Sequence, residues 1–509
     1  MMLTRESTLG FVITSLLAFA PVARADILRV PDEYPTIQAA IDVAQDHDVV
    51  LVADGVYTGP GNKDLDFCGK TITLQSENGA ENCAIDCEGE GRGLYFHSGE
   101  TRAALVDGFT IRNGRADYGG GIHCHASSPT IDNCVITANT ASSGVGHGGG
   151  LCLLECSPVV VNCTIANNTA LVGGGVDCWS ACAAVIEDCI IAGNQAHYDG
   201  GGVACSDANN PTITRCAITG NSARFGGGVV CWNQCSATLT NCIISTNWAQ
   251  TDGGGVFCFD SAVVINNCLV CGNAAEEDGG ALLAWQTTVT FANCTCATNS
   301  APNGKGLACD SWFQAYPSNI EMSNCVVWNG GDDVWNNDNS VINVTYTDIY
   351  GGWHGTGNIS VDPLFADPNN GDYRLTSGSP CIDAGDNEAV LADTLDLDED
   401  GNADEPIPFD LDGNPRFIDD PGTEDTGNPD PDYPDLPIVD MGAYEFQVPC
   451  PGDVDGDGDT DHSDLGGLLS VWDSEPGDPA WDPNADLDGD GRVGHGDLGI
   501  LLADWACGT

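Results

Sequence analysis

Basic residues are scarce in this sequence. Its 509 residues include 15 Lys and Arg against 75 Asp and Glu, so the formal net charge at pH 7 is -60. Nucleic acids and anionic membrane surfaces attract proteins through Lys and Arg, and this charge balance therefore argues against both as partners. The excess of carboxylates favours multivalent cations instead, above all calcium, because calcium takes hard oxygen ligands.

Long apolar runs are absent after the N-terminal region. Residues 9–20 are apolar, which is too short for a membrane span of about 20 residues, and the small-residue stretch Ala-Arg-Ala follows at 23–25. This order is typical of a secretory signal peptide. We therefore expect residues 1–25 to be removed. The mature chain should begin near Asp26, lack a transmembrane segment, and be exported to the cell surface or the extracellular space.

The middle of the chain lacks the 3.6-residue apolar period of helices and shows a repeat of about 26 residues instead. Three columns of identical residues and a glycine cluster recur in phase. The first cysteine column is Cys124, Cys152, Cys178, Cys205, Cys231 and Cys258. The second is Cys134, Cys163, Cys189, Cys216, Cys242, Cys268 and Cys294. The asparagine column is Asn139, Asn168, Asn194, Asn221, Asn247, Asn273 and Asn299. The glycine clusters lie at 119–121, 148–150, 173–175, 200–202, 226–228 and 253–255.

Such a repeat predicts a solenoid. A unit of two or three short strands cannot bury its apolar face alone, so it must stack on its neighbours. Stacking places equivalent residues about 4.8 Å apart, which explains the columns. Asparagines can then form amide ladders, glycines can turn corners with positive φ, and cysteines can fill a narrow core. We expect an all-β parallel β-helix over residues 61–360, clearest over 104–300.

The cysteine columns are expected to be free buried thiols, because stacked Cβ vectors run parallel and suit disulfides poorly. Disulfides between neighbouring coils stay open as an alternative. Three further pairs fall near turns and are better candidates for disulfides. They are Cys152/Cys156, Cys178/Cys182 and Cys231/Cys235.

The glycine pairs and the Asn-Cys-x-Ile-x-x-Asn pattern of residues 104–300 resemble the repeats of polymorphic outer-membrane proteins and of pectate-lyase-like β-helices. Residues 26–60 are similar to the N-terminal cap of those proteins. There a short amphipathic helix, here carrying Ile37, Ala40, Ile41 and Ala44, closes the open end of the core. The resemblance implies a right-handed parallel β-helix. It also implies that residues 361–449 form an acidic closing segment and linker.

Two acidic segments near the C-terminus follow the spacing of an EF-hand-type calcium loop. The side-chain ligands expected in the first loop, residues 453–464, are Asp453, Asp455, Asp457, Asp461 and Asp464, with the backbone carbonyl of Asp459. Those expected in the second loop, residues 486–497, are Asp486, Asp488, Asp490 and Asp497, with the backbone carbonyl of Arg492. A third candidate calcium loop, Asp396–Asp404, has no carboxylate at loop position 12. The alternative is a solvated acidic loop that binds no calcium.

Each of the two loops leads into a segment with helical apolar spacing. The apolar positions are Leu465, Leu468, Leu469 and Trp472 in the first segment and Leu498, Leu501, Leu502 and Trp505 in the second. This duplicated plan over 450–509, bracketed by Cys450 and Cys507, resembles a type I dockerin. The resemblance implies two calcium ions and a cohesin-like or other surface scaffold partner. The partner would contact His462, Ser463, His495 and Gly496, which depart from the common Ser-Thr pair and leave its identity open.

Polar side chains gather at one edge of the predicted coils and make it the candidate for catalysis. The candidates are Asp199, Arg224, Asp252 and Asp278. Asp199 and Asp252 would lie two coils apart, about 9.6 Å, near the upper end of carboxylate separations in inverting glycosidases. The simpler alternative is that Asp before Gly is good turn chemistry. His147 stands in a Gly-His-Gly triplet that echoes polygalacturonases, but the companion motifs are missing and we do not count it.

Aromatic residues recur at an outward position beside the first cysteine column, which reads His125, Leu153, Trp179, Ser206, Trp232, Phe259 and Trp285. Flat aromatic faces suit sugar rings, so Trp179, Trp232, Phe259 and Trp285 are the predicted polysaccharide-binding residues. The alternative is that they pack under a loop or against the closing segment.

The sequence therefore favours an exported β-helix that binds an extracellular polysaccharide and is held to a partner through a calcium-dependent module. If it is an enzyme, it is a polysaccharide lyase or a glycoside hydrolase. A non-catalytic structural or adhesive surface protein is the alternative.

Overall fold

The computed structural model describes residues 25–142, 144–310, 317–398, 400–434, 436–447, 450–455, 460–503 and 505. The predicted signal peptide lies outside this set except for its last residue. Within these ranges, no helix is long and apolar enough to cross a membrane.

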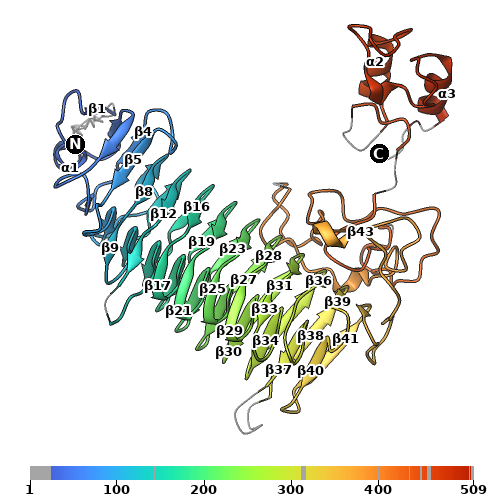
Figure 1. The fold of residues 1–509 in the computed structure, drawn as a ribbon, viewed down its shortest axis with the longest axis horizontal. Coiled ribbons are helices and arrows are strands. Elements are labelled where there is room, and N and C mark those ends of the chain that lie inside the picture. The colour runs from blue at the N-terminus through green and yellow to red at the C-terminus, as the bar shows by residue number, and fades with distance from the viewer. Residues whose placement is uncertain are drawn as a thin grey trace, which may run out of the picture.

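Strands of two to five residues stack in parallel, as the repeat predicts, and they form four long sheets (Figure 1). Sheet A contains β1 (Ile27–Val30), β2 (Val49–Val52), β4 (Thr73–Ser76), β7 (Leu105–Asp107), β11 (Thr130–Asp132), β15 (Val159–Val161), β19 (Val185–Glu187), β23 (Thr212–Thr214), β27 (Thr238–Thr240), β31 (Ala262–Asn266), β35 (Thr288–Ala292), β38 (Asn319–Ser323) and β41 (Val341–Thr345). Sheet B contains β3 (Gly55–Tyr57), β5 (Cys83–Asp86), β8 (Thr110–Arg112), β12 (Val135–Thr137), β16 (Thr164–Ala166), β20 (Ile190–Ala192), β24 (Ala217–Thr219), β28 (Ile243–Ser245), β32 (Leu269–Cys271), β36 (Thr295–Ala297), β39 (Val326–Trp328) and β42 (Asp348–Ile349).

The other two sheets carry the candidate site. Sheet C contains β6 (Leu94–Phe96), β10 (Ile122–His125), β14 (Leu151–Leu154), β18 (Val176–Trp179), β22 (Val203–Ser206), β26 (Val229–Trp232), β30 (Val256–Phe259), β34 (Leu282–Trp285), β37 (Leu307–Cys309) and β40 (Val334–Asn336). Sheet D contains β9 (Arg115–Ala116), β13 (Thr140–Ala141), β17 (Thr169–Val172), β21 (Gln195–Asp199), β25 (Ser222–Phe225), β29 (Trp248–Asp252) and β33 (Ala274–Ala275).

A central coil has four strands rather than the two or three that the sequence predicts. It runs through β22, β23, β24 and β25 in sheets C, A, B and D before it returns to sheet C at β26. The additional strand follows the asparagine of each repeat, where the chain continues in extended form up to the glycine corner. Sheet D exists because of this continuation, and the strand ends in sheet D border the candidate site.

The core lies between the sheets, and the valines that follow the glycine corners point into it. Val229 aligns with Val203 and Val256, and all three are fully buried. The corner before Val229 requires glycine, because Gly226 has φ 62° and an added Cβ would lie 2.5 Å from the Val229 carbonyl oxygen. The coil register assigned from the sequence is therefore correct at this point.

The asparagine column forms the predicted amide ladder. Asn194 Nδ2 donates to Asn221 Oδ1 at 3.0 Å, and Asn221 Nδ2 donates to Asn247 Oδ1 at 3.0 Å. Each amide also donates to a backbone carbonyl, as Asn221 does to Ile191 at 2.8 Å. The buried amides are thus satisfied, and they fix the position of the turn that leads into sheet D.

The cysteine columns are free thiols, as predicted, but the proposed disulfide pairs are wrong. The six cysteines of those pairs, Cys152, Cys156, Cys178, Cys182, Cys231 and Cys235, are all unbonded and buried. Cys152 also departs from its column, because Leu153 and not Cys152 aligns with Cys124 and Cys178. Cys152 and Leu153 therefore face opposite sides of sheet C.

The N-terminal end is closed by helix α1 (Ile37–Val43), in agreement with the predicted cap. The Thr36 side chain accepts a hydrogen bond from the Ala39 N–H, and Ile37, Ala40 and Ile41 are buried. The helix therefore covers the apolar core that the first coil would otherwise expose.

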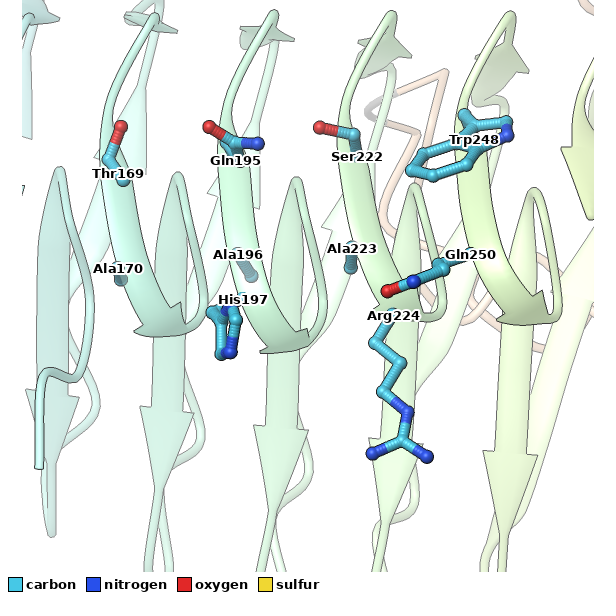
Figure 2. A pocket seen from close by; sticks show the side chains of 10 residues that line it. All are labelled: Thr169, Ala170, Gln195, Ala196, His197, Ser222, Ala223, Arg224, Trp248 and Gln250. Carbon is cyan, nitrogen blue, oxygen red and sulfur yellow. The ribbon is translucent and has the colours of Figure 1, made fainter.

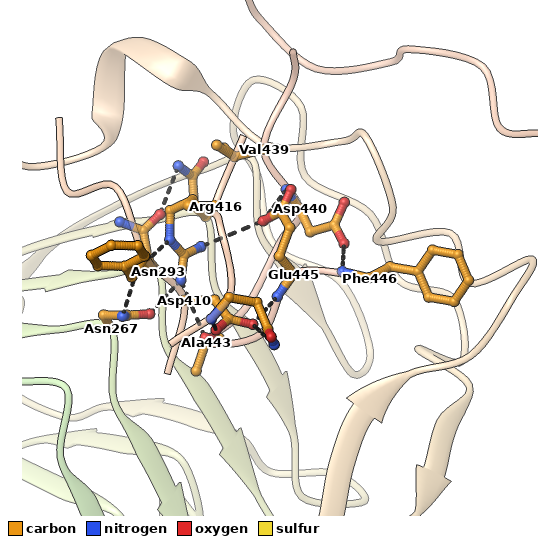
Figure 3. Close-up of polar contacts among 12 residues, drawn as sticks. Asn267, Asn293, Asp410, Arg416, Val439, Asp440, Ala443, Glu445 and Phe446 are labelled. Atoms are coloured by element: carbon orange, nitrogen blue, oxygen red, sulfur yellow. Dashed lines mark hydrogen bonds and ion pairs between the residues drawn. The ribbon is translucent and has the colours of Figure 1, made fainter. Parts of the chain in front are cut away.

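The segment from 361 to 447 packs against the side of the last coils, beside sheet B (Figure 1). It contains β43 (Phe365–Asp367), η2 (Pro368–Asn370), β44 (Asp372–Leu375) and η3 (Asn387–Ala389). Buried Arg416 bonds the Asn267 side chain of the β-helix, donates to the Ala443 carbonyl at 3.1 Å and lies 3.8 Å from Glu445 Oε2 (Figure 3). This polar network fixes the closing segment to the solenoid.

The C-terminal region has α2 (His462–Ser470), η4 (Pro483–Ala485) and α3 (His495–Ala503). Its own small core contains Val454, Leu468, Ala485, Val493 and Leu501. Leu469 and Leu502, which the sequence places in the apolar stripes, are instead exposed at equivalent positions of the two helices. Cys450 is disulfide-bonded, whereas Cys507 lies outside the described residues.

Candidate functional site

The outer face of sheet C presents two columns of side chains, because alternate residues of each strand point away from the core. The inner column is Tyr95, His123, Cys152, Asp177, Ala204, Val230, Phe257, Leu283, Ala308 and Trp335. The outer column is His125, Leu154, Trp179, Ser206, Trp232, Phe259 and Trp285. The predicted outer column is thus confirmed except at Leu153, which is buried in the core and replaced by Leu154.

A third row borders this face where the strands of sheet D end, and we call it the rim row. It consists of Tyr118, His147, Val172, Asp199, Phe225, Asp252, Asp278 and Asn303. Val172 and Phe225 pack directly against the inner column of sheet C. The sheet C face and the rim row therefore form one continuous surface.

The C-terminal half of this face is aromatic. Trp232 lies with its ring centroid 5.8 Å from Phe257 and 4.6 Å from Phe259, and Phe259 lies 5.0 Å from Trp285. These rings pack on the apolar inner column, and the cluster they form contains no described residue of the closing segment. The alternative that the closing segment covers them is therefore not supported for the described part of the chain.

The N-terminal half of the face is polar and centres on His147 and Asp177. His147 Nδ1 lies 2.7 Å from Asp177 Oδ2, and Asp177 is fully buried. The His147 ring stacks on Trp179 with a centroid distance of 4.7 Å. Burial lowers the pKa of His147, but the hydrogen bond and charge of Asp177 outweigh this effect and raise the pKa overall. The Asp177 pKa is raised by burial.

A second histidine lies beside this pair. His123 Nδ1 is 2.9 Å from Arg92 Nη1, and the His123 ring stacks on Tyr95 at 5.0 Å and on Tyr118 at 5.7 Å. Burial and the Arg92 charge lower the pKa of His123 to about 3. His123 is therefore neutral near pH 7, and its Nδ1 accepts the hydrogen bond from the guanidinium.

The carboxylates of the rim row have raised pKa values. Burial, followed by the Asp177 charge, raises the pKa of Asp199 to about 6. Burial, followed by the Asp278 charge, raises the pKa of Asp252 to about 7. Asp278 donates its backbone N–H to Asp252 Oδ1 at 3.2 Å and accepts from Asn303 Nδ2 at 2.7 Å. Repulsion between these neighbouring charges therefore contributes to the raised pKa of Asp252, but burial is the larger cause.

Arg224 does not belong to the rim row that holds the carboxylates. Phe225, not Arg224, lies between Asp199 and Asp252 in the rim row. Arg224 projects from the outer face of sheet D, where it borders an open hollow of about 230 Å³ with Trp248 and Gln250 (Figure 2). This volume is below the range of about 300–1,000 Å³ that is usual for ligand pockets. The Arg224 guanidinium lies 4.9 Å above the Phe225 ring. Its charge partly offsets the rise in the pKa of Asp199.

The His147–Asp177 pair is not among the candidate catalytic residues that the sequence indicates. The Gly-His-Gly triplet around His147 was visible, but its partner stands one coil further along, 30 residues away. Asp177 precedes a core cysteine in a strand that otherwise reads as buried. A carboxylate in such a strand was the available signal, because a buried acid requires a partner.

The acidic loops of the C-terminal region bring carboxylates together. One oxygen each from Asp453, Asp455 and Asp464 lie within 4.8 Å of one another, and the same holds for Asp486, Asp488 and Asp497. The predicted ligands Asp461 and Asp490 are not in these two groups. Asp461 accepts from the Ser463 N–H and caps α2, and Asp490 accepts from the Arg492 N–H. The predicted ligands Asp457 and Asp459 lie outside the described residues.

The four predicted partner-contact residues are exposed at the starts of α2 and α3. The His462 ring contacts Trp505 and the His495 ring contacts Trp472, each edge-on at 5.1 Å. Ser463 and Gly496 follow these histidines at equivalent positions. In the third candidate loop, Asp396, Asp398 and Asp400 form a group, but Asp404 does not belong to it.

Comparison with known proteins identifies the family. Residues 71–242 and 222–348 match the model of the family described as "Right handed beta helix region". Together these residues make up more than half of the chain, which therefore belongs to the right-handed β-helix family. No curated protein matches the sequence.

Several solved structures are similar in fold. A pectate lyase, Pel9A, has a TM-score of 0.43 and 13% identity, with 84% of this chain and 97% of that chain covered. A GH87 α-1,3-glucanase from Streptomyces thermodiastaticus has a TM-score of 0.36 and 14% identity, with 67% and 70% covered. The A-module of the Azotobacter vinelandii mannuronan C-5 epimerase AlgE6 has a TM-score of 0.36 and 13% identity, with 64% and 94% covered. Scores this low carry no inference about activity.

Proposed function

We propose that this protein binds an extracellular polysaccharide along the sheet C face and cleaves it at the polar end, where His147, Asp177 and Asp199 lie. The observation that carries the proposal is the continuity of the surface. A strip of aromatic rings leads along stacked strands to a buried carboxylate–imidazole pair, with a carboxyl group of raised pKa beside it. A binding strip and acid–base groups on one surface are what cleavage of a polymer requires.

The aromatic strip suits a sugar chain. Trp232, Phe259 and Trp285 stand on successive coils, and the spacing of about 4.8 Å per coil gives a strip of about 10 Å. Aromatic rings present large apolar faces at low conformational cost, and the C–H faces of sugar rings can stack on them. Trp179 extends the strip to the polar end, where its Nε1 donates to Asp207 at 2.8 Å and fixes the ring.

The polar end can supply both a base and an acid. Asp177 holds the Nδ1–H of His147, which leaves the Nε2 lone pair to accept a proton from the substrate or from a water molecule. Asp199, with a pKa of about 6, keeps a protonated fraction near neutral pH and can donate to the leaving oxygen. These roles fit acid–base cleavage of a glycosidic bond by hydrolysis. They also fit a lyase, in which the base removes a proton from the sugar ring.

We also propose that the C-terminal module binds two calcium ions and holds the exported protein to a cohesin-like or other surface scaffold. The paired carboxylate groups and the equivalent exposed positions on α2 and α3 support this proposal. Calcium would neutralise the crowded carboxylates and order both loops.

The test measures retention and product release on a panel of acidic and neutral polysaccharides. Trp232→Ala should lose retention, whereas Trp248→Ala, an equally large truncation on sheet D, should keep it. His147→Gln and Asp199→Asn should keep retention and lose product release. A double bond in the product, seen by ultraviolet absorbance, would identify a lyase. Retention without product from the wild type would favour the non-catalytic adhesive alternative.

A further inference from the structure

Asp383 in the closing segment is a buried carboxylate without a partner. Its side chain is fully buried, and neither Oδ1 nor Oδ2 accepts a hydrogen bond of normal geometry, although the Asp420 backbone N–H is near. Nearby Asp440 is equally buried, but its two oxygens accept from the backbone N–H groups of Asp383 and Phe446 at 2.8 and 2.6 Å. Leaving a buried charged group unpaired costs several kcal/mol, so the two orphaned oxygens of Asp383 call for a ligand.

Two further carboxylates converge on Asp383. One oxygen from each of Asp383, Asp419 and Asp425 lies within 4.8 Å of the others. Asp419 and Asp425 are exposed, so the group reaches from the interior to the surface. Arg416, the buried arginine of the closing segment, is directed at Glu445 and Asn267. Three like charges at this spacing repel one another unless a cation lies between them.

The backbone holds this arrangement in place. The Asp383 carbonyl accepts from the N–H groups of Thr426 and Gly427 at 2.9 and 3.1 Å, which ties the loop bearing Asp425 to Asp383. Asp420 shapes the preceding turn, because its Oδ2 accepts from Thr423 Oγ1 at 2.7 Å. The carboxylates therefore meet through two segments that are far apart in the sequence and hydrogen-bonded in the fold.

We propose that Asp383, Asp419 and Asp425 bind a calcium ion that fastens the 419–427 loop to the closing segment. Carboxylate oxygens without histidine or cysteine favour a hard cation over the transition metals. Calcium is favoured over magnesium because it accepts six to eight oxygen ligands in flexible geometry, and the exposed side of the group leaves room for water. The site is distinct from the two C-terminal loops and from the Asp396–Asp404 loop.

The position of the ion explains what it would do. Asp383 donates its backbone N–H to Asp440, and Asp440 belongs to the buried network with Glu445 that is drawn in Figure 3. Arg416 of the same network bonds Asn267 in the β-helix. An ion at Asp383 would therefore stabilise the attachment of the closing segment to the solenoid, and its loss should loosen the 419–427 loop first.

The experiment counts calcium ions bound to the full chain by equilibrium dialysis after calcium has been stripped. Asp419→Asn/Asp425→Asn removes two exposed ligands and should bind one ion fewer than the wild type, or bind that ion at least tenfold more weakly. Glu424→Gln/Asp432→Asn removes the same charge from exposed acids of the same region and should match the wild type. Asp383→Asn should behave as the ligand variant does.

A second readout is proteolysis within the 419–427 loop. Calcium should slow cleavage in the wild type and in the control variant but not in the Asp419→Asn/Asp425→Asn variant. Equal calcium stoichiometry and affinity in all proteins would overturn the proposal. So would equal protection by magnesium at the same concentration.

Discussion

Asp177→Asn should lower the proton affinity of His147. The carboxylate accepts the His147 Nδ1–H at 2.7 Å inside the protein, and it raises the His147 pKa against the effect of burial. Hydrogen bonds to charged groups contribute about 1.5–3 kcal/mol, which corresponds to roughly a tenfold to hundredfold loss in proton affinity when the charge is removed. Burial then dominates, and the His147 pKa should fall below its ordinary value.

The assay is a pH titration of the histidine ring protons by NMR, with the His147 signal identified by its absence in His147→Gln. Asp207→Asn is the matched control, because Asp207 bonds the neighbouring Trp179 ring from an exposed position. That variant should leave the His147 titration unchanged. An unchanged titration in Asp177→Asn would refute the pairing on which the proposed base depends.

Three further predictions concern the fold, the calcium module and the rim row. Val229→Asp should unfold the protein or trap it in a misfolded state, because an unpaired buried carboxylate costs several kcal/mol of a free energy of unfolding of about 5–15 kcal/mol. A thermal melt that matches the wild type by circular dichroism would contradict this. Calcium chelation should unfold the helices of the C-terminal module and leave the β-helix folded, since the core of the module is small. Loss of the far-UV circular dichroism signal of the β-strands on chelation would contradict this. Asp252 has an ordinary pKa of 3.8 and a folded pKa of about 7, so its stabilising contribution is complete below about pH 3.8 and is lost as pH rises through 7. Asp252→Asn should therefore gain thermal stability relative to wild type between pH 5 and pH 8, and a constant difference would refute the assignment.

The sequence predicted the β-helix because several columns independently report the same register. Each asparagine amide bonds its equivalent on the neighbouring coil, so the spacing of the asparagines follows the coil length directly. The one slip, at Cys152, was detectable from these columns. Cys134 to Cys163 and Asn139 to Asn168 both step by 29 residues, which makes Leu153 the equivalent of Cys124. Cys152 matches the column in residue type but lies one position before the residue that aligns with it.

The site was harder to predict because its residues come from different elements of different coils. His147 lies in the connection before β14, and Asp177 lies in β18. Their contact depends on the distance between the rim row and sheet C. The pattern of strands in a sequence does not predict that distance. The orphaned oxygens of Asp383 likewise follow from packing between segments about 40 residues apart, which no local spacing reveals.

The central claim is that the polymer lies on the sheet C face. A crystal structure of the His147→Gln variant with a bound oligosaccharide, chosen from those that the wild type retains, tests it most directly. We predict sugar rings stacked over Trp232, Phe259 and Trp285, with the chain running toward Asp199. Sugar bound in the sheet D hollow beside Trp248, with the sheet C face bare, would contradict the account.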